Sequence, residues 1–210
     1  FTTATALEKG LGINYEMTVP PSGYASPIYV DGNGRPIPVN NAGNYADHLS
    51  ITDALAQSPN TAFIKLEEFT GVPDVVDMAV RLGMKSLATT PFVDPKTGRR
   101  TDRSIAEVTK AQKQASFTLG VSPTSVLELA NVGATLASAG KWCPPSPIAS
   151  ITDPSGAAVP VTEAPCDQAV EPGLANTLLT ALSKDDQPGG TSAAAAGQVG
   201  WDRPMAGKTG

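Results

Sequence analysis

Turn-forming residues divide this sequence into short segments and so limit the length of its helices and strands. The chain has 20 glycines and 19 prolines among 210 residues. Asp31-Gly32-Asn33-Gly34 separates two short apolar runs, and Asp153-Pro154-Ser155-Gly156 separates two more. Both tetrapeptides favour tight turns between antiparallel strands. We therefore expect two surface hairpins built from short strands.

Helical periodicity dominates the middle of the chain, from about residue 46 to residue 142. Ser50 and Asp53 are spaced like the start of a helix, which should end at the Ser58-Pro59 step because proline disfavours helical backbone in its predecessor. A further helix is predicted over residues 73–83. Residues 86–104 are polar and rich in turn formers, which predicts a surface loop.

The strongest helical pattern begins at Ser122-Pro123 and ends at Gly140. Its expected apolar face consists of Val126, Leu129, Ala130, Val132, Gly133, Leu136 and Ala137. Residues 201–210 are expected to lead into a strand. Together these patterns predict an α/β (α+β) fold, with an antiparallel sheet flanked by helices and an all-helical lobe. The sheet-associated parts would be residues 1–45 and 143–210.

Charge argues against a nucleic-acid partner, and hydropathy argues against a membrane-spanning segment within this sequence. The formal net charge is -5 and the isoelectric point about 4.8, and there is no stripe of lysine and arginine that could neutralise a nucleic-acid backbone. No apolar run approaches the length that spans a bilayer. The first ten residues resemble the later turns of a helix ending at Gly10, without a start signal or signal peptide. We expect both ends to have been cut from a longer protein.

Cys143 and Cys166 are the two cysteines of the chain. They could be buried free thiols, or they could form a disulfide, which would place the protein in an oxidising compartment outside the cytoplasm. The absence of a Cys-x-x-Cys pair or a nearby histidine disfavours zinc. The acidic turn at Asp31 lacks the bidentate glutamate of a calcium loop, so no metal or other cofactor is expected.

Candidate chemistry lies in two stretches. Ser58 and Asn60 place a hydroxyl and a carboxamide two positions apart, and Lys208-Thr209-Gly210 adds an ammonium, a hydroxyl and an open backbone. The simpler interpretation is a serine N-cap with Pro59 at the first helical position, as also expected at Ser122-Pro123. His48 is interpreted as a surface residue because nothing in the sequence supplies it with a Ser-His-Asp set. Glu67, Glu68 and Glu128 are interpreted as solvated or capping groups.

These motifs together resemble the penicillin-binding protein and serine β-lactamase superfamily, whose pattern combines Ser-x-x-Lys, Ser-Asp-Asn and Lys-Thr-Gly. The resemblance covers essentially the whole chain and is most like the transpeptidase domain of class A, bifunctional penicillin-binding proteins of actinobacteria. It rests on Ala6-Leu7-Glu8-Lys9-Gly10, Ser58-Pro59-Asn60-Thr61-Ala62-Phe63, Phe117-Thr118-Leu119-Gly120, Leu127-Glu128-Leu129-Ala130 and Met205-Ala206-Gly207-Lys208-Thr209-Gly210. The residues flanking the cysteines, Trp142-Cys143-Pro144-Pro145 and Pro165-Cys166-Asp167-Gln168, look most actinobacterial.

The resemblance implies a role for each site residue. Ser58 would relay a proton to the leaving amine, and Asn60 would bind a side-chain amide of the substrate. Lys208 would supply positive potential, Thr209 would bind the terminal carboxylate of a D-Ala-D-Ala stem or a β-lactam, and Gly210 would keep a strand edge open. The implied partners are peptidoglycan stem peptides and β-lactams. The implied parent is a membrane-anchored enzyme at the outer face of the plasma membrane, with a glycosyltransferase domain upstream.

One departure from the family pattern limits what these residues could do alone. The Ser-x-x-Lys motif, which in the family lies just before the helix that Phe1 continues, is missing. We therefore expect residues 1–210 to be a single incomplete transpeptidase domain without its nucleophile, and to be inactive by themselves. The alternatives are a non-catalytic penicillin-recognising sensor or binding domain of the same fold, and a helical structural domain in which the motifs occur by chance.

Overall fold

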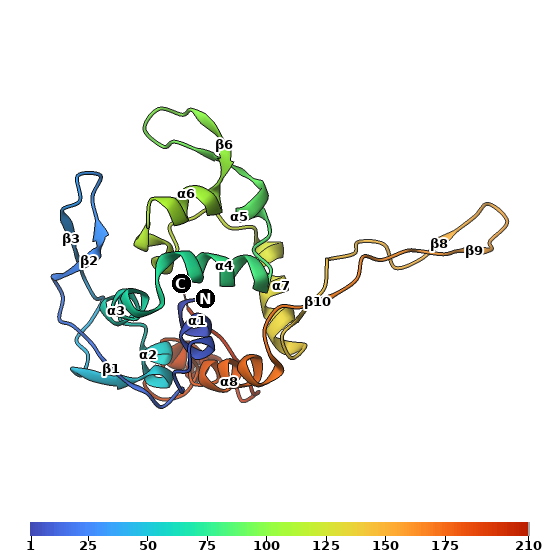
Figure 1. The fold of residues 1–210 in the computed structure, drawn as a ribbon. Coiled ribbons are helices and arrows are strands. Elements are labelled where there is room, and N and C mark those ends of the chain that lie inside the picture. The colour runs from blue at the N-terminus through green and yellow to red at the C-terminus, as the bar shows by residue number, and fades with distance from the viewer. Residues whose placement is uncertain (210) are drawn as a thin grey trace.

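The computed structural model describes residues 1–209 as a helical body from which three hairpins project (Figure 1). The helices are α1 (Thr2–Glu8), α2 (Ile51–Gln57), α3 (Asn60–Thr70), α4 (Val72–Leu82), α5 (Ser86–Thr89), α6 (Ile105–Ala111), the 3-10 helix η1 (Ala115–Leu119), α7 (Val126–Ala137), α8 (Pro172–Leu182) and α9 (Ala193–Val199). The strands are β1 (Glu16–Thr18), β2 (Tyr24–Val30), β3 (Pro36–Val39), β4 (His48–Ser50), β5 (Pro91–Val93), β6 (Arg100–Ser104), β7 (Lys141–Trp142), β8 (Ile151–Thr152), β9 (Ala158–Val159) and β10 (Asp167–Gln168). The predicted α/β class is confirmed. Among the described residues, the antiparallel pairing is distributed over five two-stranded ribbons.

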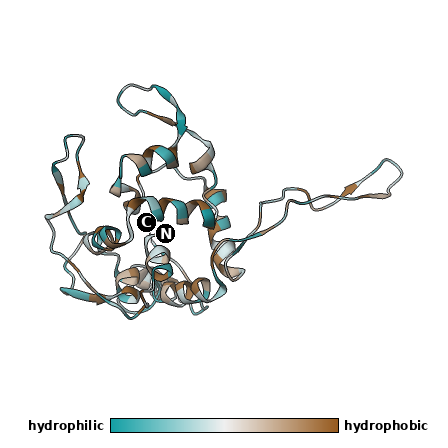
Figure 2. Cartoon of the chain, in the orientation of Figure 1, coloured by the Kyte–Doolittle hydropathy of each residue, from teal (hydrophilic) through white to brown (hydrophobic). Residues whose placement is uncertain are grey.

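The core forms where α1 packs against α3, α4 and α8. Residues Thr2 to Ala6 of α1 are all buried, and α4 turns a stripe of buried apolar side chains toward them. Figure 2 shows brown and teal segments that alternate along α4, as expected for a helix with one apolar and one polar face. Arg81 of α4 holds the Glu8 carboxylate of α1 through two hydrogen bonds of 2.9 and 2.6 Å. The start of α1 and the junction of α2 and α3 line the same cavity.

Serine side chains cap the starts of two helices, α2 and α6. Ser50 accepts a hydrogen bond from the Asp53 amide at 3.0 Å and so caps α2, as predicted. Ser104 and Glu107 form a complete capping box at the start of α6. The predicted loop at residues 86–104 is wrong, because this segment forms α5 and the β5–β6 hairpin.

Two other predictions about helix ends are wrong. Ser58 does not cap the start of a helix: it ends α2 in the left-handed conformation, and Pro59 is the N-cap of α3. Helix α7 begins only at Val126, after Ser125, and ends at Ala137 before Gly140. Its expected apolar face is largely uncovered, since only the C-terminal half of the helix contributes buried side chains. Val126 and Leu129 are 85% and 53% exposed.

Both predicted hairpins are present, and an aspartate organises each turn. Asp31 Oδ1 accepts the amides of Asn33 and Arg35 at 2.8 and 3.0 Å in the β2–β3 turn. Asp153 makes the corresponding bonds with Ser155 and Ala157 in the β8–β9 turn. His48 lies exposed in β4, as expected. Residues 201–209 form no strand.

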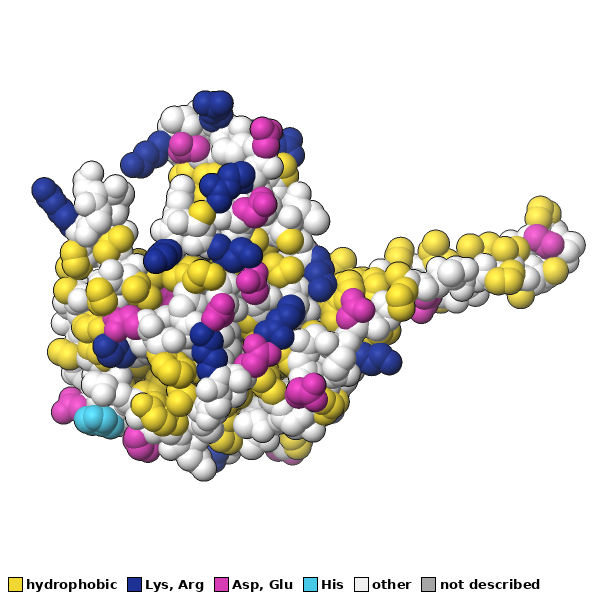
Figure 3. Space-filling model, viewed as in Figure 1, with side chains coloured by type: hydrophobic (Ala, Val, Ile, Leu, Met, Phe, Trp, Pro, Cys, Tyr) yellow, Lys and Arg dark blue, Asp and Glu magenta, His cyan; other side chains and the backbone are white. Residues whose placement is uncertain are grey.

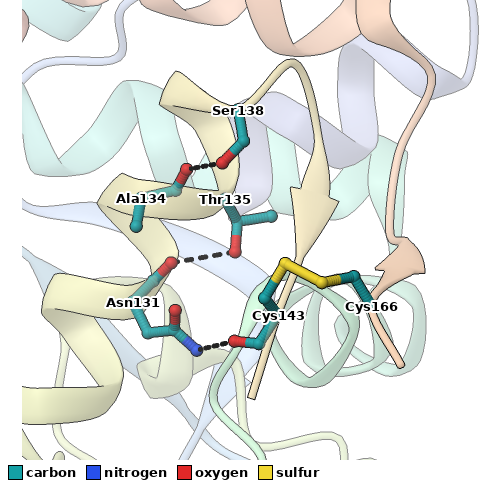
Figure 4. The surroundings of a disulfide bond; sticks show 6 residues. All are labelled: Asn131, Ala134, Thr135, Ser138, Cys143 and Cys166. Carbon is teal, nitrogen blue, oxygen red and sulfur yellow. Dashed lines mark hydrogen bonds between the residues drawn. A yellow bond between two sulfur atoms is a disulfide. The ribbon is translucent and has the colours of Figure 1, made fainter. Parts of the chain in front are cut away.

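A long arm formed by residues 144–165 projects from the body beyond β7 and β10 (Figure 1). The Cys143–Cys166 disulfide closes its base, so the disulfide alternative holds. Asn131 of α7 donates a hydrogen bond of 3.1 Å to the Cys143 carbonyl beside this bridge (Figure 4). Figure 3 shows the arm as mostly hydrophobic and uncharged, while the visible face of the body has interspersed charges of both signs. No helix within residues 1–209 has the length and apolar composition needed to cross a bilayer.

Glu67 of α3 is one of three described residues with a buried side-chain polar atom that lacks a hydrogen-bond partner; the others are Thr70 and Trp142. Glu67 is 0% exposed, and neither carboxylate oxygen has a hydrogen-bond partner within residues 1–209. Burial raises the pKa of Glu67 to about 8. The interpretation of Glu67 as a solvated or capping group is wrong, because its helix face is turned inward against α1.

We predict that Glu67→Gln removes a pH-dependent loss of stability. In the folded chain this carboxyl binds its proton up to a pKa of about 8, whereas in the unfolded chain it ionises near the ordinary value of 4.5. Stability therefore falls as pH rises through this interval, by up to about 5 kcal/mol. Denaturant unfolding of both proteins at pH 5 and pH 8 should show the variant gaining relative stability at the higher pH.

The neighbouring Glu68 provides a matched control. Burial acts to raise its pKa, but hydrogen bonds from Lys65, Tyr24 and Ser26 outweigh burial and lower it. Glu68→Gln should therefore be destabilising at pH 8. A stability difference between Glu67→Gln and the parent that stays constant from pH 5 to pH 8 would show that Glu67 is not protonated in the fold.

Candidate active-site cleft

Ser58 stands at a sharp break between two helices. Its φ of 61° and ψ of 45° lie in the left-handed region, which is unusual for a residue with a side chain. Its amide donates to the Ala54 carbonyl at 2.8 Å and completes the last turn of α2, and Pro59 then redirects the chain into α3. The hydroxyl of Ser58 is thereby presented at the mouth of the α2–α3 junction.

Lys208 reaches this hydroxyl from 150 residues further along the chain, with Nζ donating to Ser58 Oγ at 2.6 Å. A second hydrogen bond of 2.9 Å joins the same ammonium to the Thr209 carbonyl. Burial lowers the pKa of Lys208 below its ordinary value, while the carboxylate of Asp185 acts to raise it. A partly desolvated cation and a hydroxyl therefore share one space.

Asn60 is the first residue of α3 and lies two residues after Ser58. Its Nδ2 donates to the Asn40 carbonyl at 2.9 Å. The adjacent Asn41 bonds both the amide and the hydroxyl of Thr61, at 3.0 and 2.9 Å. The segment that follows β3 is thereby fastened across the start of α3 and holds the Asn60 carboxamide in place.

Ser58, Asn60, Lys208 and Thr209 line one cavity of about 300 Å³. Its other lining residues are Phe1, Thr2, Thr3, Leu55, Phe63, Thr118, Leu119 and Gly120. Two larger hollows of about 760 Å³ lie elsewhere, one beside α9 and one between the β2–β3 hairpin and residues 112–116. We take the smaller cavity as the site because it is where the ammonium, hydroxyls and carboxamide converge. The helical structural domain with chance motifs is not compatible with this convergence.

Several cavity residues had no assigned role in the sequence. The Thr2 and Thr118 hydroxyls contact each other and join α1 to η1 across the cavity floor. Thr118 belongs to the Phe117-Thr118-Leu119-Gly120 stretch, which was recognised only as a family-like motif. A regular helix period could not have located these threonines, because one lies at a helix start and the other in a 3-10 turn.

The remaining candidates are Gly210 and the two cysteines. Gly210 falls outside the described residues. Cys143 and Cys166 are at the base of the arm and do not line the cavity. Within residues 1–209 no group of histidine, cysteine, aspartate and glutamate side chains is arranged to hold a metal ion.

The chain contains one literal Ser-x-x-Lys sequence, Ser138 to Lys141, which the sequence interpretation overlooked. Ser138 is the C-cap of α7, its hydroxyl donates to the Ala134 carbonyl, and Lys141 begins β7 (Figure 4). Neither residue lines the cavity. This tetrapeptide therefore does not supply a nucleophile to the site.

The penicillin-binding protein transpeptidase domain matches this sequence over residues 1–210. The chain belongs to this transpeptidase family. A comparison with curated proteins returns no match.

One solved structure similar to this chain is penicillin-binding protein A of Mycobacterium tuberculosis as an imipenem acyl-enzyme, which is 22% identical with a TM-score of 0.67. The alignment covers 88% of this chain and 42% of that one. PonA1 of the same organism is 23% identical with a TM-score of 0.65, over 87% of this chain and 44% of that one. A peptidoglycan glycosyltransferase from Burkholderia ambifaria is 21% identical with a TM-score of 0.65, over 93% and 56%. These similarities show the fold, and the chain spans about half or less of each neighbour.

We predict that Ser58→Gly is at least as stable as Ser58→Ala. Glycine adopts φ of 61° without steric cost, whereas alanine retains a Cβ in the left-handed region. The advantage of glycine should reach about 1 kcal/mol in the free energy of unfolding, reduced by its greater freedom when unfolded. Both variants lose the hydroxyl that Lys208 contacts, so the pair separates backbone strain from the side-chain bond. Denaturant unfolding in which alanine is clearly the more stable would contradict the left-handed conformation.

Proposed function

We propose that this chain forms one wall of the cleft of a serine D,D-transpeptidase, which cross-links peptidoglycan stem peptides and is acylated by β-lactams. The observation that supports this most is the 2.6 Å bond between Lys208 and Ser58 in a cavity that also contains Asn60 and Thr209. The family match supports the reaction class. A neighbouring fold, penicillin-binding protein A of Mycobacterium tuberculosis, is described as an acyl-enzyme with imipenem.

The proposed reaction is acyl transfer through a covalent intermediate. A serine of the family's Ser-x-x-Lys motif would attack the carbonyl of the penultimate D-Ala, and the C–N bond to the terminal D-Ala would break. The leaving nitrogen takes a proton as the terminal D-Ala departs. An amine of a neighbouring stem peptide then attacks the ester, which forms the cross-link and returns the serine.

Ser58 is suited to deliver the proton to the leaving nitrogen. Since Lys208 donates to Ser58 Oγ, the hydrogen of the Ser58 hydroxyl remains available for a group in the cavity. Lys208 would also stabilise the oxygen charge that remains if this proton is given away. In this proposal Ser58 transfers the proton and Lys208 supplies the electrostatic support.

The remaining residues would position the substrate. Asn60 would bind a side-chain amide of the stem peptide, and Thr209 would bind its terminal carboxylate beside the Lys208 charge. Gly210, outside the described residues, would keep the strand edge open. Residues 1–210 would be part of one transpeptidase domain, with a helical lobe at about residues 46–142.

The location of the parent is part of the same proposal. The Cys143–Cys166 disulfide is typical of proteins outside the cytoplasm. One neighbour is a peptidoglycan glycosyltransferase, which supports a parent with a glycosyltransferase domain upstream. We propose that this parent is anchored in the plasma membrane with the cleft facing the cell envelope.

The test is covalent labelling of the full-length protein by a fluorescent penicillin, measured as a second-order acylation rate. The intact protein should be labelled, and residues 1–210 alone should not. Lys208→Ala should slow labelling by about 100- to 1,000-fold, as removal of one electrostatic contact in an acyl-transfer site does. Lys184→Ala, which removes an exposed lysine of the same part of the chain, should leave the rate unchanged.

Two outcomes of this labelling experiment would contradict parts of the proposal. If the intact protein binds penicillin reversibly without covalent labelling, the chain belongs to a penicillin-recognising sensor or binding domain. If Lys208→Ala is labelled as fast as the parent, Lys208 has no part in acyl transfer.

A further inference from the structure

A buried carboxylate lies behind the Lys208-Thr209 pair and has no role in the proposed chemistry. Asp185 follows α8 and is only 2% exposed. Its Oδ1 accepts the Thr191 hydroxyl at 2.6 Å, and its Oδ2 accepts the Ser192 hydroxyl at 2.5 Å. The Ser192 amide also donates to the Asp185 carbonyl at 3.0 Å. The chain between these residues is thus folded back around one carboxylate.

This loop is attached to the two elements that form the site. The Thr191 amide donates to the Ala56 carbonyl of α2 at 2.9 Å, two residues before Ser58. The Gly207 amide donates to the Leu182 carbonyl at 3.0 Å, immediately before Lys208. Gly190 lies so close to the Lys184 and Asp185 carbonyls that a Cβ there would overlap them. Hydrogen bonds to α2 and to the segment just before Lys208 therefore fix the position of the loop that contains the Asp185 carboxylate.

The hydrogens of this cluster can be assigned by counting. The Thr191 hydroxyl has one hydrogen and donates it to Asp185. At the 2.6 Å contact between the Thr191 and Thr209 hydroxyls, Thr191 must therefore accept and Thr209 must donate. The result is a directed chain from Thr209 through Thr191 to Asp185, which directs the Thr209 hydrogen to Thr191 and leaves the Thr209 oxygen only acceptor capacity toward the cavity.

The charge of Asp185 acts on the other cavity residue. Burial of Lys208 lowers its pKa, and the Asp185 carboxylate is the charged group that opposes this effect. Of the groups that contact Lys208, the Ser58 hydroxyl and the Thr209 carbonyl have no charge. Asp185 therefore favours the cationic form of Lys208 in the cavity.

We infer that Asp185 is a positioning residue of this cleft, which orients the Thr209 hydroxyl through Thr191 and supports the Lys208 ammonium from behind. The inference deepens the proposed function, because Thr209 could donate to a ligand carboxylate only by giving up its bond to Thr191, and Lys208 would supply the charge beside it. Asp185 itself touches no ligand. Its effect on a ligand is transmitted by the Thr191 hydroxyl and by its electric field.

Two variants of the full-length protein separate these effects. Asp185→Asn keeps the shape of the side chain but removes its charge, so the pKa of Lys208 should fall. The second-order rate of labelling by fluorescent penicillin should fall about ten-fold. Most of this loss should come from weaker binding of the penicillin, and the limiting rate at saturation should change little. Thr191→Val breaks the hydroxyl chain and keeps the charge. It frees the Thr209 hydrogen for a ligand carboxylate, so it should strengthen binding without lowering the pKa of Lys208, and Thr191→Ser should return binding to the level of the parent.

The readouts distinguish positioning from a purely structural role. The pKa of Lys208 is measured by carbon NMR of the dimethylated lysine, assigned with Lys208→Arg, and needs no catalysis. Asp186→Asn, which alters the adjacent carboxylate, should change neither the pKa nor the labelling. A folded Asp185→Asn variant with unchanged Lys208 pKa and unchanged labelling would overturn the inference. If Asp185→Asn does not fold, equal labelling of Thr191→Val and Thr191→Ser would overturn it.

These outcomes are separate from those of the proposed function. A parent protein that penicillin does not label contradicts transpeptidation, while a lowered Lys208 pKa in Asp185→Asn still supports the coupling. A labelled parent in which neither Asp185 nor Thr191 matters retains the proposed function and removes Asp185 from it.

Discussion

The hydrogen bond between Lys208 and Ser58 is the contact on which the candidate site depends. It joins the end of the described chain to the break between α2 and α3, and it brings a cation into a space where burial opposes charge. Such a contact persists only if both sides are held independently. Ser58 is held by the end of α2 and by Pro59, and Lys208 is held by the bond between Gly207 and Leu182.

Helix α3 connects the site to the core. At its first turn, Asn60 and Thr61 secure the segment after β3, and Phe63 lines the cavity. One turn further, its inward face meets α1, where Glu67 is buried without a hydrogen-bond partner in the described chain. An unpaired buried carboxyl costs stability unless it is protonated. The same helix therefore combines a well-paired polar end at the cavity with a poorly satisfied acid in the core.

The two buried acids, Glu67 and Asp185, show how environment sets the role of a residue type. Both are removed from solvent. Asp185 accepts two short hydrogen bonds from hydroxyl groups, and its charge acts on Lys208, whereas no group within residues 1–209 donates a hydrogen bond to Glu67. The apolar surrounding of Glu67 raises its pKa and so favours the neutral form. Sequence gives no warning of this difference, since neither residue belongs to a recognised motif.

Local sequence determined the turns at Asp31 and Asp153 and the Ser50 cap. These features depend on residues within a few positions of one another, so periodicity and turn chemistry are sufficient to predict them. Membership of the transpeptidase family could also be predicted from sequence, but from motifs distributed over the whole chain. Only the tertiary structure decided that Ser58 adopts left-handed backbone, that Lys208 reaches it, that the cysteines pair and that half of α7 lies uncovered. Each of these depends on contacts between distant segments: α1 against α3, the loop of Asp185 against α2, and β7 beside β10. The motif residues could thus be chosen from sequence, but their convergence on one cavity follows from how the helices pack.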